Sequence, residues 1–295
     1  MSTPDVPQQP QGHTVLSVLR GAEDWLLRRG VEAPKRSAEL LLGKVLGLGR
    51  LQLYLAHDRP LDEPERAAMR GLLVRRGQGE PVAYLLGSWS FRGHELAVSP
   101  AVLIPRPETE ELVSLALEHA PQGARVIDLG TGSGAMAIAL AVERPDLHVS
   151  AVELSKNAMA LAQANAVRHG VADRITFHAG SWWEPVPVGE CYDLVVSNPP
   201  YIDPGAPEGL AADVRAHEPP LALFSSPGDA ASCYRAIVQP IAARLRPGGW
   251  LLVETGGGAV APTRALFERC EELQSVVVRQ DFAGLDRYVE AQRRS

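Results

Sequence analysis

The chain has 295 residues, of which 45% are hydrophobic and 22% are charged, and its formal net charge is −6 at pH 7. This length allows one large domain or two smaller ones, and this composition is typical of a globular protein. The net negative charge argues against broad electrostatic binding to nucleic acid. Three widely spaced cysteines, Cys191, Cys233 and Cys270, form neither a metal-binding pair nor a disulfide framework, which favours a cytoplasmic protein.

The N-terminal residues 1–12 are polar and rich in proline, so we expect them to be disordered and not to act as a signal peptide. Apolar residues then recur at helical spacing over 15–27 and 38–46, and Asp62-Glu63-Pro64 is typical of a helix start. These patterns predict a helical domain over residues 1–86.

A β-hairpin is expected next, because residues 88–91 and 95–98 alternate in polarity on either side of Arg92-Gly93-His94. We interpret residues 87–106 as a linker that contains this hairpin.

Residues 107–295 are expected to form the second domain, in which predicted helices and strands alternate. The strands are expected at 125–129, 149–153, 175–178, 192–197, 250–254, 275–278 and 287–290. The helices are expected at 107–119, 135–142, 156–169, 231–245 and 263–272. Such alternation predicts an α/β fold with a doubly wound, mostly parallel sheet.

A glycine-rich loop joins the first of these strands to its helix and contains Gly130, Thr131, Gly132, Ser133 and Gly134. Glycine permits unusual backbone angles and lets a ligand touch the backbone. The loop fits the dinucleotide-binding pattern G-x-G-x-x-G/A, with Ala135 last, and it equally fits enzymes that use S-adenosylmethionine (SAM). Glu153 ends the next strand and can accept hydrogen bonds from ribose hydroxyls of either cofactor.

The sequence Asn198-Pro199-Pro200-Tyr201 follows the strand at 192–197 and forms a stiff corner, because each proline restricts the backbone. The side-chain oxygen of Asn198 and the carbonyl of Pro199 are two acceptors beside the Tyr201 ring. Together they suit a planar –NH2 group. A dehydrogenase has no use for this arrangement, so the corner favours SAM as the cofactor.

At this point the chain closely resembles the release-factor glutamine methyltransferases, the HemK or PrmC family of class I SAM-dependent methyltransferases. The resemblance rests on Asn198–Tyr201, on Glu80-Pro81-Val82-Ala83-Tyr84-Leu85-Leu86-Gly87 and on Ile104-Pro105-Arg106-Pro107-Glu108-Thr109-Glu110. It covers residues 13 to 291 and implies a seven-stranded methyltransferase sheet behind a small N-terminal helical domain.

The resemblance also implies roles for individual residues. Gly130–Gly134 would line the methionine part of SAM, Glu153 would hold the ribose, and Trp182 would contact the adenine, with Trp183 as the alternative. Arg106 and Glu108 would brace the loop near the site or pair with each other.

The implied substrate is the glutamine side chain in the Gly-Gly-Gln motif of peptide-chain release factors. Asn198, Pro199 and Tyr201 would be catalytic. Asn198 and Pro199 would accept hydrogen bonds from the amide, Tyr201 would pack on the amide plane and exclude water, and Pro200 would complete the substrate site. Asn198 would also contact the cofactor. The N-terminal domain would grip the release factor. We expect the protein to be a monomer. We also expect no metal site, since the eight histidines show no spacing typical of metal ligands.

Four other functions stay open. A nicotinamide-dependent oxidoreductase fits the glycine loop, although no His or Lys arrangement suits hydride chemistry. A nucleic-acid adenine-N6 methyltransferase also acts on a planar amino group, but it generally needs a basic track. A ribosomal-protein glutamine methyltransferase shares the chemistry. A non-enzymatic SAM-binding protein would be expected to lack the corner or the glycine loop, and both are present.

Overall fold

The structure is a computed structural model that describes residues 13–205 and 210–295. The expected disorder of residues 1–12 therefore lies outside the described residues. The chain forms two compact units. One contains the residues up to Gly87 together with Ala212–His217, and the other contains Ser88–Ala211 and Glu218–Ser295. None of the helices in the described ranges combines the length and the apolar character needed to cross a lipid bilayer.

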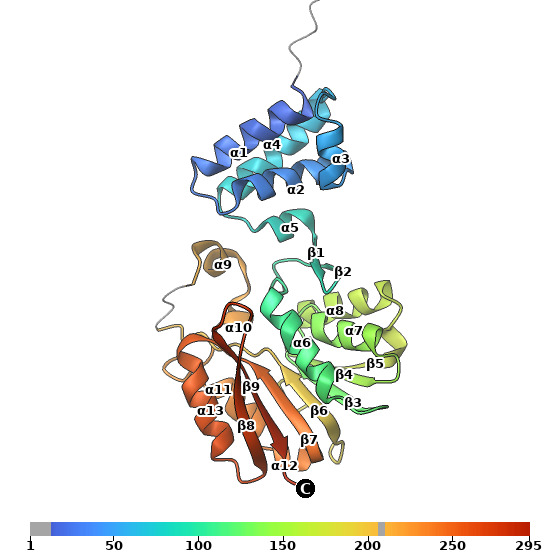
Figure 1. The fold of residues 1–295 in the computed structure, drawn as a ribbon, viewed down its shortest axis with the longest axis vertical. Coiled ribbons are helices and arrows are strands. Elements are labelled where there is room, and N and C mark those ends of the chain that lie inside the picture. Colours follow the sequence, from blue (N-terminus) through green and yellow to red (C-terminus); the bar gives the residue numbers. More distant parts are fainter. Residues whose placement is uncertain (1–12, 206–209) are drawn as a thin grey trace, which may run out of the picture. The chain divides into compact units, whose positions relative to one another are not determined.

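The first unit is helical (Figure 1). Its helices are α1 (Val15–Leu27), α2 (Pro34–Leu46), α3 (Arg50–Leu55), α4 (Glu63–Gly77), α5 (Val82–Leu86) and α9 (Ala212–His217). Helix α4 begins where the sequence predicts, because Asp62 and Glu65 form a reciprocal capping box. The helices present apolar faces to a shared core that includes Leu26, Leu41 and Met69.

Helix α9 comes from the chain segment that follows the Asn198 corner, yet it groups with the N-terminal helices. Within this unit the buried guanidinium of Arg76 lies 3.7 Å from the Asp213 carboxylate and donates a 3.0 Å hydrogen bond to the Glu80 carbonyl. A buried cation requires such partners. Arg76 therefore links α9 to α4.

The second unit opens with the predicted hairpin of β1 (Ser88–Phe91) and β2 (His94–Ala97). Arg92 and Gly93 both have positive φ, at 49° and 78°, which matches the twist of the flanking strands in a two-residue turn. The helices of this unit are α6 (Pro107–His119), α7 (Ala135–Glu143), α8 (Lys156–Arg168), α10 (Pro220–Leu223), α11 (Ser232–Val238), α12 (Ile241–Arg244) and α13 (Val260–Glu268), with 3₁₀ turns at Ala172–Arg174 and Gly257–Ala259.

Seven strands form one sheet in the order β5-β4-β3-β6-β7-β9-β8. They are β3 (Arg125–Leu129), β4 (His148–Glu153), β5 (Ile175–Ala179), β6 (Tyr192–Ser197), β7 (Leu245–Glu254), β8 (Leu273–Gln280) and β9 (Asp286–Arg293). All strand pairs are parallel except those made by β9, which runs antiparallel to β7 and β8. This arrangement confirms the predicted fold class.

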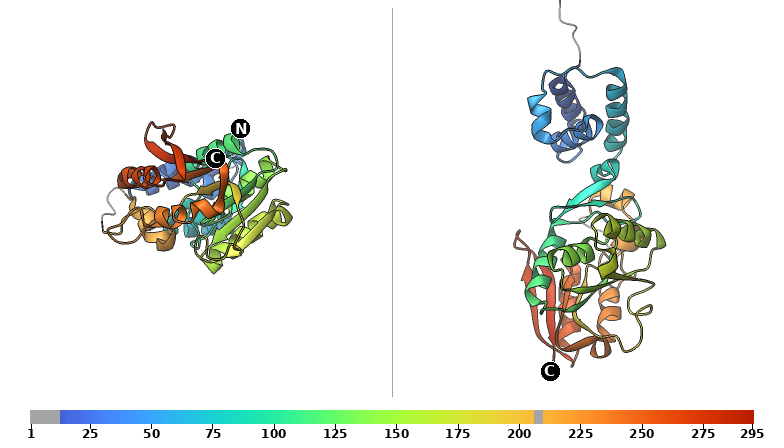
Figure 2. Two further views of the ribbon diagram at one scale, coloured as in Figure 1. Left: turned by 90° about the horizontal axis from the view of Figure 1, so that it is seen from below. Right: turned by 90° about the vertical axis from the view of Figure 1, so that its right-hand side faces the viewer.

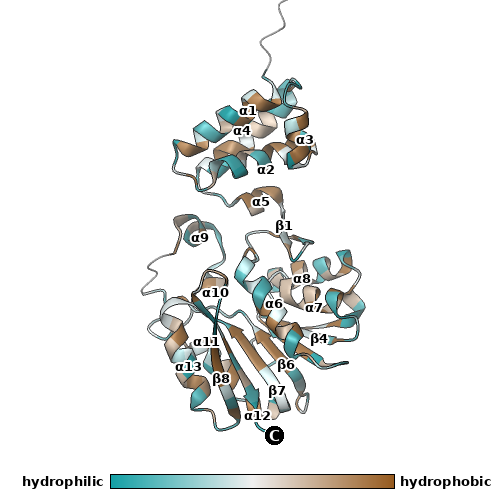
Figure 3. Ribbon diagram, in the orientation of Figure 1, coloured by the Kyte–Doolittle hydropathy of each residue, from teal (hydrophilic) through white to brown (hydrophobic). Residues whose placement is uncertain are grey.

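Helices cover both faces of the sheet (Figure 2). Successive strand residues point to opposite faces, so Val126 packs with α6 and α7 whereas Ile127 packs with α11 and α13. Strand β6 is buried on both faces at Leu194, Val195 and Val196, which form its apolar, brown stretch in Figure 3. A doubly covered parallel sheet needs such continuous apolar strands.

One predicted helix is wrong. The expected helix at 231–245 is two short helices, α11 and α12, separated by Pro240. Proline cannot donate the helical hydrogen bond, and its ring collides with the preceding turn.

Candidate active site

The carboxyl ends of three neighbouring strands, β4, β3 and β6, meet at one edge of the sheet. In the register, Asp128 of β3 lies opposite both Ala151 of β4 and Val196 of β6. Open parallel sheets bind ligands at this edge, and a cavity of about 290 Å³ lies there.

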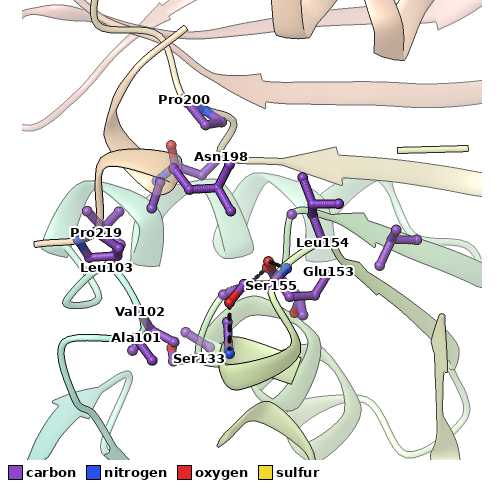
Figure 4. A pocket seen from close by; sticks show the side chains of 18 of the residues that line it. Ala101, Val102, Leu103, Ser133, Glu153, Leu154, Ser155, Asn198, Pro200 and Pro219 are labelled. Carbon is purple, nitrogen blue, oxygen red and sulfur yellow. Dashed lines mark hydrogen bonds between the residues drawn. The ribbon is translucent and has the colours of Figure 1, made fainter. Parts of the chain in front are cut away.

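Most of the predicted site residues line this cavity. They are Gly130, Thr131, Gly132, Ser133, Glu153, Trp182, Asn198 and Pro200. Gly134, Pro199 and Tyr201 are not part of its lining. Figure 4 shows Asn198 and Pro200 across the pocket from Glu153 and Ser155.

The glycine loop follows β3 in a conformation that needs glycine. Gly130, Gly132 and Gly134 have φ values of 82°, 59° and 83°. Gly134 is the N-cap residue of α7, and a Cβ there would lie 3.0 Å from Ile138 and 3.2 Å from Ala162. Gly134 is therefore needed for the loop to pack closely against the helices, and the other two expose backbone to the pocket.

Asp128 supports the loop from beneath. It is fully buried and accepts a 2.6 Å hydrogen bond from the Thr131 hydroxyl. Burial raises the pKa of Asp128 to about 7, since the charged form loses its hydration.

Glu153 is held by backbone donors on both sides. Its Oε2 accepts a 2.9 Å hydrogen bond from Gly132 N, and its Oε1 accepts one of 2.8 Å from Ser155 N. Each carboxylate oxygen can accept more than one hydrogen bond, so Glu153 retains capacity toward the pocket. The arrangement fixes an acceptor that suits neighbouring hydroxyl groups.

The two adjacent tryptophans have different environments. Trp182 lines the pocket and has a φ of 46°, which is uncommon for a side chain of this size. Trp183 is buried, and its Nε1 donates a 3.0 Å hydrogen bond to the Ile237 carbonyl. Of the two candidates for the adenine contact, only Trp182 faces the pocket.

The Asn198 corner follows β6. The Nδ2 of Asn198 donates a 3.1 Å hydrogen bond to the Thr109 hydroxyl, which in turn donates one of 2.7 Å to the buried Glu254 carboxylate. No residue in the described part of the chain donates a hydrogen bond to Oδ1 of Asn198. That oxygen is available to a ligand.

The ring of Tyr201 packs on the α11 side of the sheet and close to Gly256, where an added Cβ would lie 3.4 Å from Cε2. Burial raises the pKa of Tyr201 to about 12, so the hydroxyl stays protonated at neutral pH. Tyr201 thus supports the corner from outside the pocket lining.

Two segments cover another side of the pocket, residues 101–106 and 219–224. Glu218 joins them, because its carboxylate accepts a 3.1 Å hydrogen bond from Ile104 N and forms a 2.5 Å ion pair with Arg106. Arg106 therefore braces this loop, as one of the two expectations had it, and its partner is Glu218.

The comparisons with known proteins agree with this geometry. A family model for the PrmC N-terminal domain matches residues 17–87, and one for the methyltransferase small domain matches residues 109–214. The release factor glutamine methyltransferase of Geobacter sulfurreducens is 43% identical over 282 residues, which cover 96% of this chain and 98% of that protein. The chain belongs to the release factor glutamine methyltransferase family.

Another relative in this family, from Nitratidesulfovibrio vulgaris, is 42% identical over 290 residues and covers 97% of this chain and 98% of its own length. Among solved structures, a methyltransferase from Pyrococcus furiosus has a TM-score of 0.53 at 15% identity, covering 75% of this chain and 98% of that one. The similarity to this solved structure shows the fold alone. The chain is a methyltransferase, and the oxidoreductase interpretation of the glycine loop is excluded.

Three residues of the site were not assigned from the sequence: Thr109, Glu218 and Glu254. Thr109 lies within the Pro-Arg-Pro-Glu-Thr-Glu segment that carried the resemblance, and Glu254 ends a buried strand, as Glu153 does. The position of Glu254, an acidic residue at the end of a second strand, was therefore a signal that could have assigned it to the site. Among residues 13–205 and 210–295, no group of three or more His, Cys, Asp or Glu side chains is placed to hold a metal ion.

Proposed function

We propose that this protein transfers a methyl group from SAM to the side-chain amide nitrogen of the glutamine in the Gly-Gly-Gln motif of release factors. The observation that carries the proposal is the Asn198 corner, which presents the side-chain oxygen of Asn198 in the same pocket as the glycine loop and Glu153. Family membership supports the substrate, because the relatives are named release factor glutamine methyltransferases.

The residues of the pocket fit SAM as the cofactor. Glu153 keeps acceptor capacity for the ribose hydroxyls although Gly132 N and Ser155 N already bind it. The glycine loop would hold the methionine part, and Trp182 would contact the adenine. When bound, SAM supplies an electrophilic methyl group on a sulfonium centre.

The reaction is difficult because the lone pair of an amide nitrogen is delocalised into its carbonyl. Oδ1 of Asn198 and the carbonyl of Pro199 would accept the two N–H groups and so fix the nitrogen toward the methyl group. Positive charge passes to this nitrogen as the new N–C bond forms and the S–CH3 bond breaks, with S-adenosylhomocysteine as the leaving group. Both acceptors would stabilise that charge most strongly in the transition state.

No strong base is required afterwards, because an alkylated amide that has gained positive charge loses its proton readily to water. Pro200 lines the pocket beside Asn198 and limits the space open to the amide. The prediction that Tyr201 packs on the amide plane would require its ring to turn toward the pocket, and its contacts near Gly256 favour a supporting role.

We further propose that the N-terminal helical unit contacts the release factor, since a protein substrate needs contacts beyond one side chain. The family model for this segment matches residues 17–87. The reaction would take place in the cytoplasm, where the three free cysteines stay reduced.

Mass spectrometry of an unmethylated release factor after incubation with this protein and SAM tests the proposed function. We expect the mass of one methyl group on the Gly-Gly-Gln glutamine, and no gain with a release factor whose glutamine is replaced by alanine. Transfer to a ribosomal protein or to adenine in nucleic acid, with none to the release factor, would contradict the proposal.

A further inference from the structure

Three structural elements meet behind Asn198. Thr109 lies in the first turn of α6, Asn198 follows β6, and Glu254 ends β7. The parallel register pairs Ser197 with Val253, so the next residues, Asn198 and Glu254, are neighbours at the carboxyl ends of adjacent strands. The Thr109 hydroxyl bridges them, 3.1 Å from Asn198 Nδ2 and 2.7 Å from Glu254 Oε2.

The number of available protons gives this bridge a direction. An ionised carboxylate only accepts hydrogen bonds, and a threonine hydroxyl has a single proton to donate. With that proton directed to Glu254, the Thr109 oxygen can only accept from Asn198. Asn198 must then turn Nδ2 toward Thr109 and Oδ1 away from it.

We propose that Thr109 and Glu254 are positioning residues that fix the amide orientation of Asn198, so that its oxygen rather than its nitrogen meets the substrate. This inference rests on the proposed function and deepens it. The two orientations of an asparagine amide have almost the same shape, so packing alone selects weakly between them. In the reversed orientation Nδ2 would face the N–H groups of the substrate, and one acceptor of the reaction would be lost.

The environment of Glu254 makes the orientation of the Asn198 amide sensitive to pH. Burial raises the pKa of Glu254 to about 7, opposed by the hydrogen bond from Thr109 and by the positive charge of Arg287 on β9. Glu108 at the start of α6 also raises this pKa, whereas Arg106 lowers it. The neighbouring hydroxyls belong to Tyr201 at the corner, Tyr234 on α11 and Tyr288 on β9, and that of Tyr234 donates to the Glu254 carbonyl at 2.8 Å.

Protonation of Glu254 removes the direction of the bridge. The protonated carboxyl can donate to Thr109, and Thr109 can then donate to Oδ1 of Asn198, which reverses the amide. The productive orientation is therefore held above the pKa of Glu254 and released below it. We expect kcat at saturating SAM to fall as the pH decreases through about 7, since neither the substrate amide nor Asn198 titrates in this range. Another carboxyl with a pKa of about 7, Asp128, supports the glycine loop, where titration should affect cofactor binding.

The test compares Thr109→Val, Thr109→Ser and Glu254→Gln with the wild-type protein on an unmethylated release factor, measuring kcat, KM, SAM affinity and the pH profile from 6 to 8. Thr109→Val removes the hydroxyl at almost constant shape, and we expect kcat to fall about 10- to 100-fold. Thr109→Ser keeps the hydroxyl and should retain most of the wild-type kcat and its pH dependence.

Glu254→Gln keeps the size of the side chain, but its amide can both donate and accept a hydrogen bond. It therefore does not fix the direction of the hydrogen bond with the Thr109 hydroxyl. We expect kcat to fall about tenfold at pH 8 and to change little between pH 6 and 8. SAM affinity should stay within about threefold of the wild-type value in all three variants, which also shows that they are folded.

Two results would overturn the positioning role. One is a Thr109→Val protein with wild-type kcat and pH profile, and the other is a loss of SAM affinity equal to the loss of kcat. A wild-type protein that methylates no release factor would instead overturn the proposed function, and the positioning role with it.

Discussion

The glycine-loop wall, formed by Gly130–Gly134 and Glu153, and the corner at Asn198–Tyr201 both contribute residues to the lining of one pocket but are held by different kinds of contact. Backbone groups of nearby segments hold the wall, since Gly132 N and Ser155 N both donate to Glu153. Side chains far apart in the chain hold the corner, because Thr109 is 89 positions from Asn198 and 145 from Glu254.

This difference matches the two tasks of the site. The wall must bind a cofactor in its ground state, for which preformed backbone geometry suffices. The corner must present an acceptor in one orientation as charge develops, which requires a directed hydrogen bond. Changes at the wall should therefore affect binding, and changes at the corner should affect kcat.

The largest expected effect is that of Asn198→Ala. Removing a group that stabilises charge in the transition state typically costs about 10²–10³ in kcat. Assays of methyl transfer to the release factor should show this loss of kcat. Calorimetry should show that SAM affinity stays within about threefold of the wild-type value. Unchanged kcat with weakened SAM binding would assign Asn198 to the wall.

Glu153→Ala should have the opposite signature. It removes the ribose acceptor and leaves Gly132 N and Ser155 N without their partner, so SAM affinity should fall about 10- to 100-fold. At saturating SAM, kcat should stay near the wild-type value. A variant that binds SAM with wild-type affinity but has a low kcat would contradict the assignment of Glu153 to cofactor binding.

Trp182 and Trp183 provide a matched pair. Trp182→Ala should weaken SAM binding about three- to tenfold through the lost aromatic contact. Trp183→Phe should leave SAM affinity unchanged but lower the free energy of unfolding by about 1 kcal/mol, since the Ile237 carbonyl loses its hydrogen bond. Calorimetry and urea unfolding separate the two effects, and a reversed pattern would assign the adenine contact to Trp183.

The smallest effect on methyl transfer is expected for Asp128→Asn, because an amide oxygen can still accept from Thr131. Its effect is on the pH dependence of stability. The pKa of Asp128 is raised to about 7 in the folded protein and lies near 4 in the unfolded chain. The carboxyl therefore contributes stability below about pH 4, and that contribution is lost as the pH rises to about 7.

Urea unfolding at pH 5 and pH 8 tests this sign. The wild-type protein should lose more free energy of unfolding between these pH values than Asp128→Asn does. Equal losses would show that Asp128 does not carry the effect. Glu254, whose pKa is also raised to about 7, contributes in the same direction in both proteins.

Local patterns predicted the wall of the pocket and most of the fold. The strand that ends at Glu153, the glycine loop and the start of α6 at Pro107 all follow from spacing and residue type. The sequence did not reveal the partners of Asn198 and Arg106, because Thr109, Glu254 and Glu218 reach them only through tertiary folding. The break at Pro240 was visible in the sequence, but the apolar pattern on both sides favoured a single helix.

The most direct test of the proposed orientation of Asn198 is a crystal structure of the protein with S-adenosylhomocysteine and a Gly-Gly-Gln peptide. We expect the glutamine nitrogen within hydrogen-bond distance of both Oδ1 of Asn198 and the Pro199 carbonyl, with Nδ2 of Asn198 on Thr109. A glutamine whose carbonyl, rather than its nitrogen, meets the Asn198 side chain would contradict it.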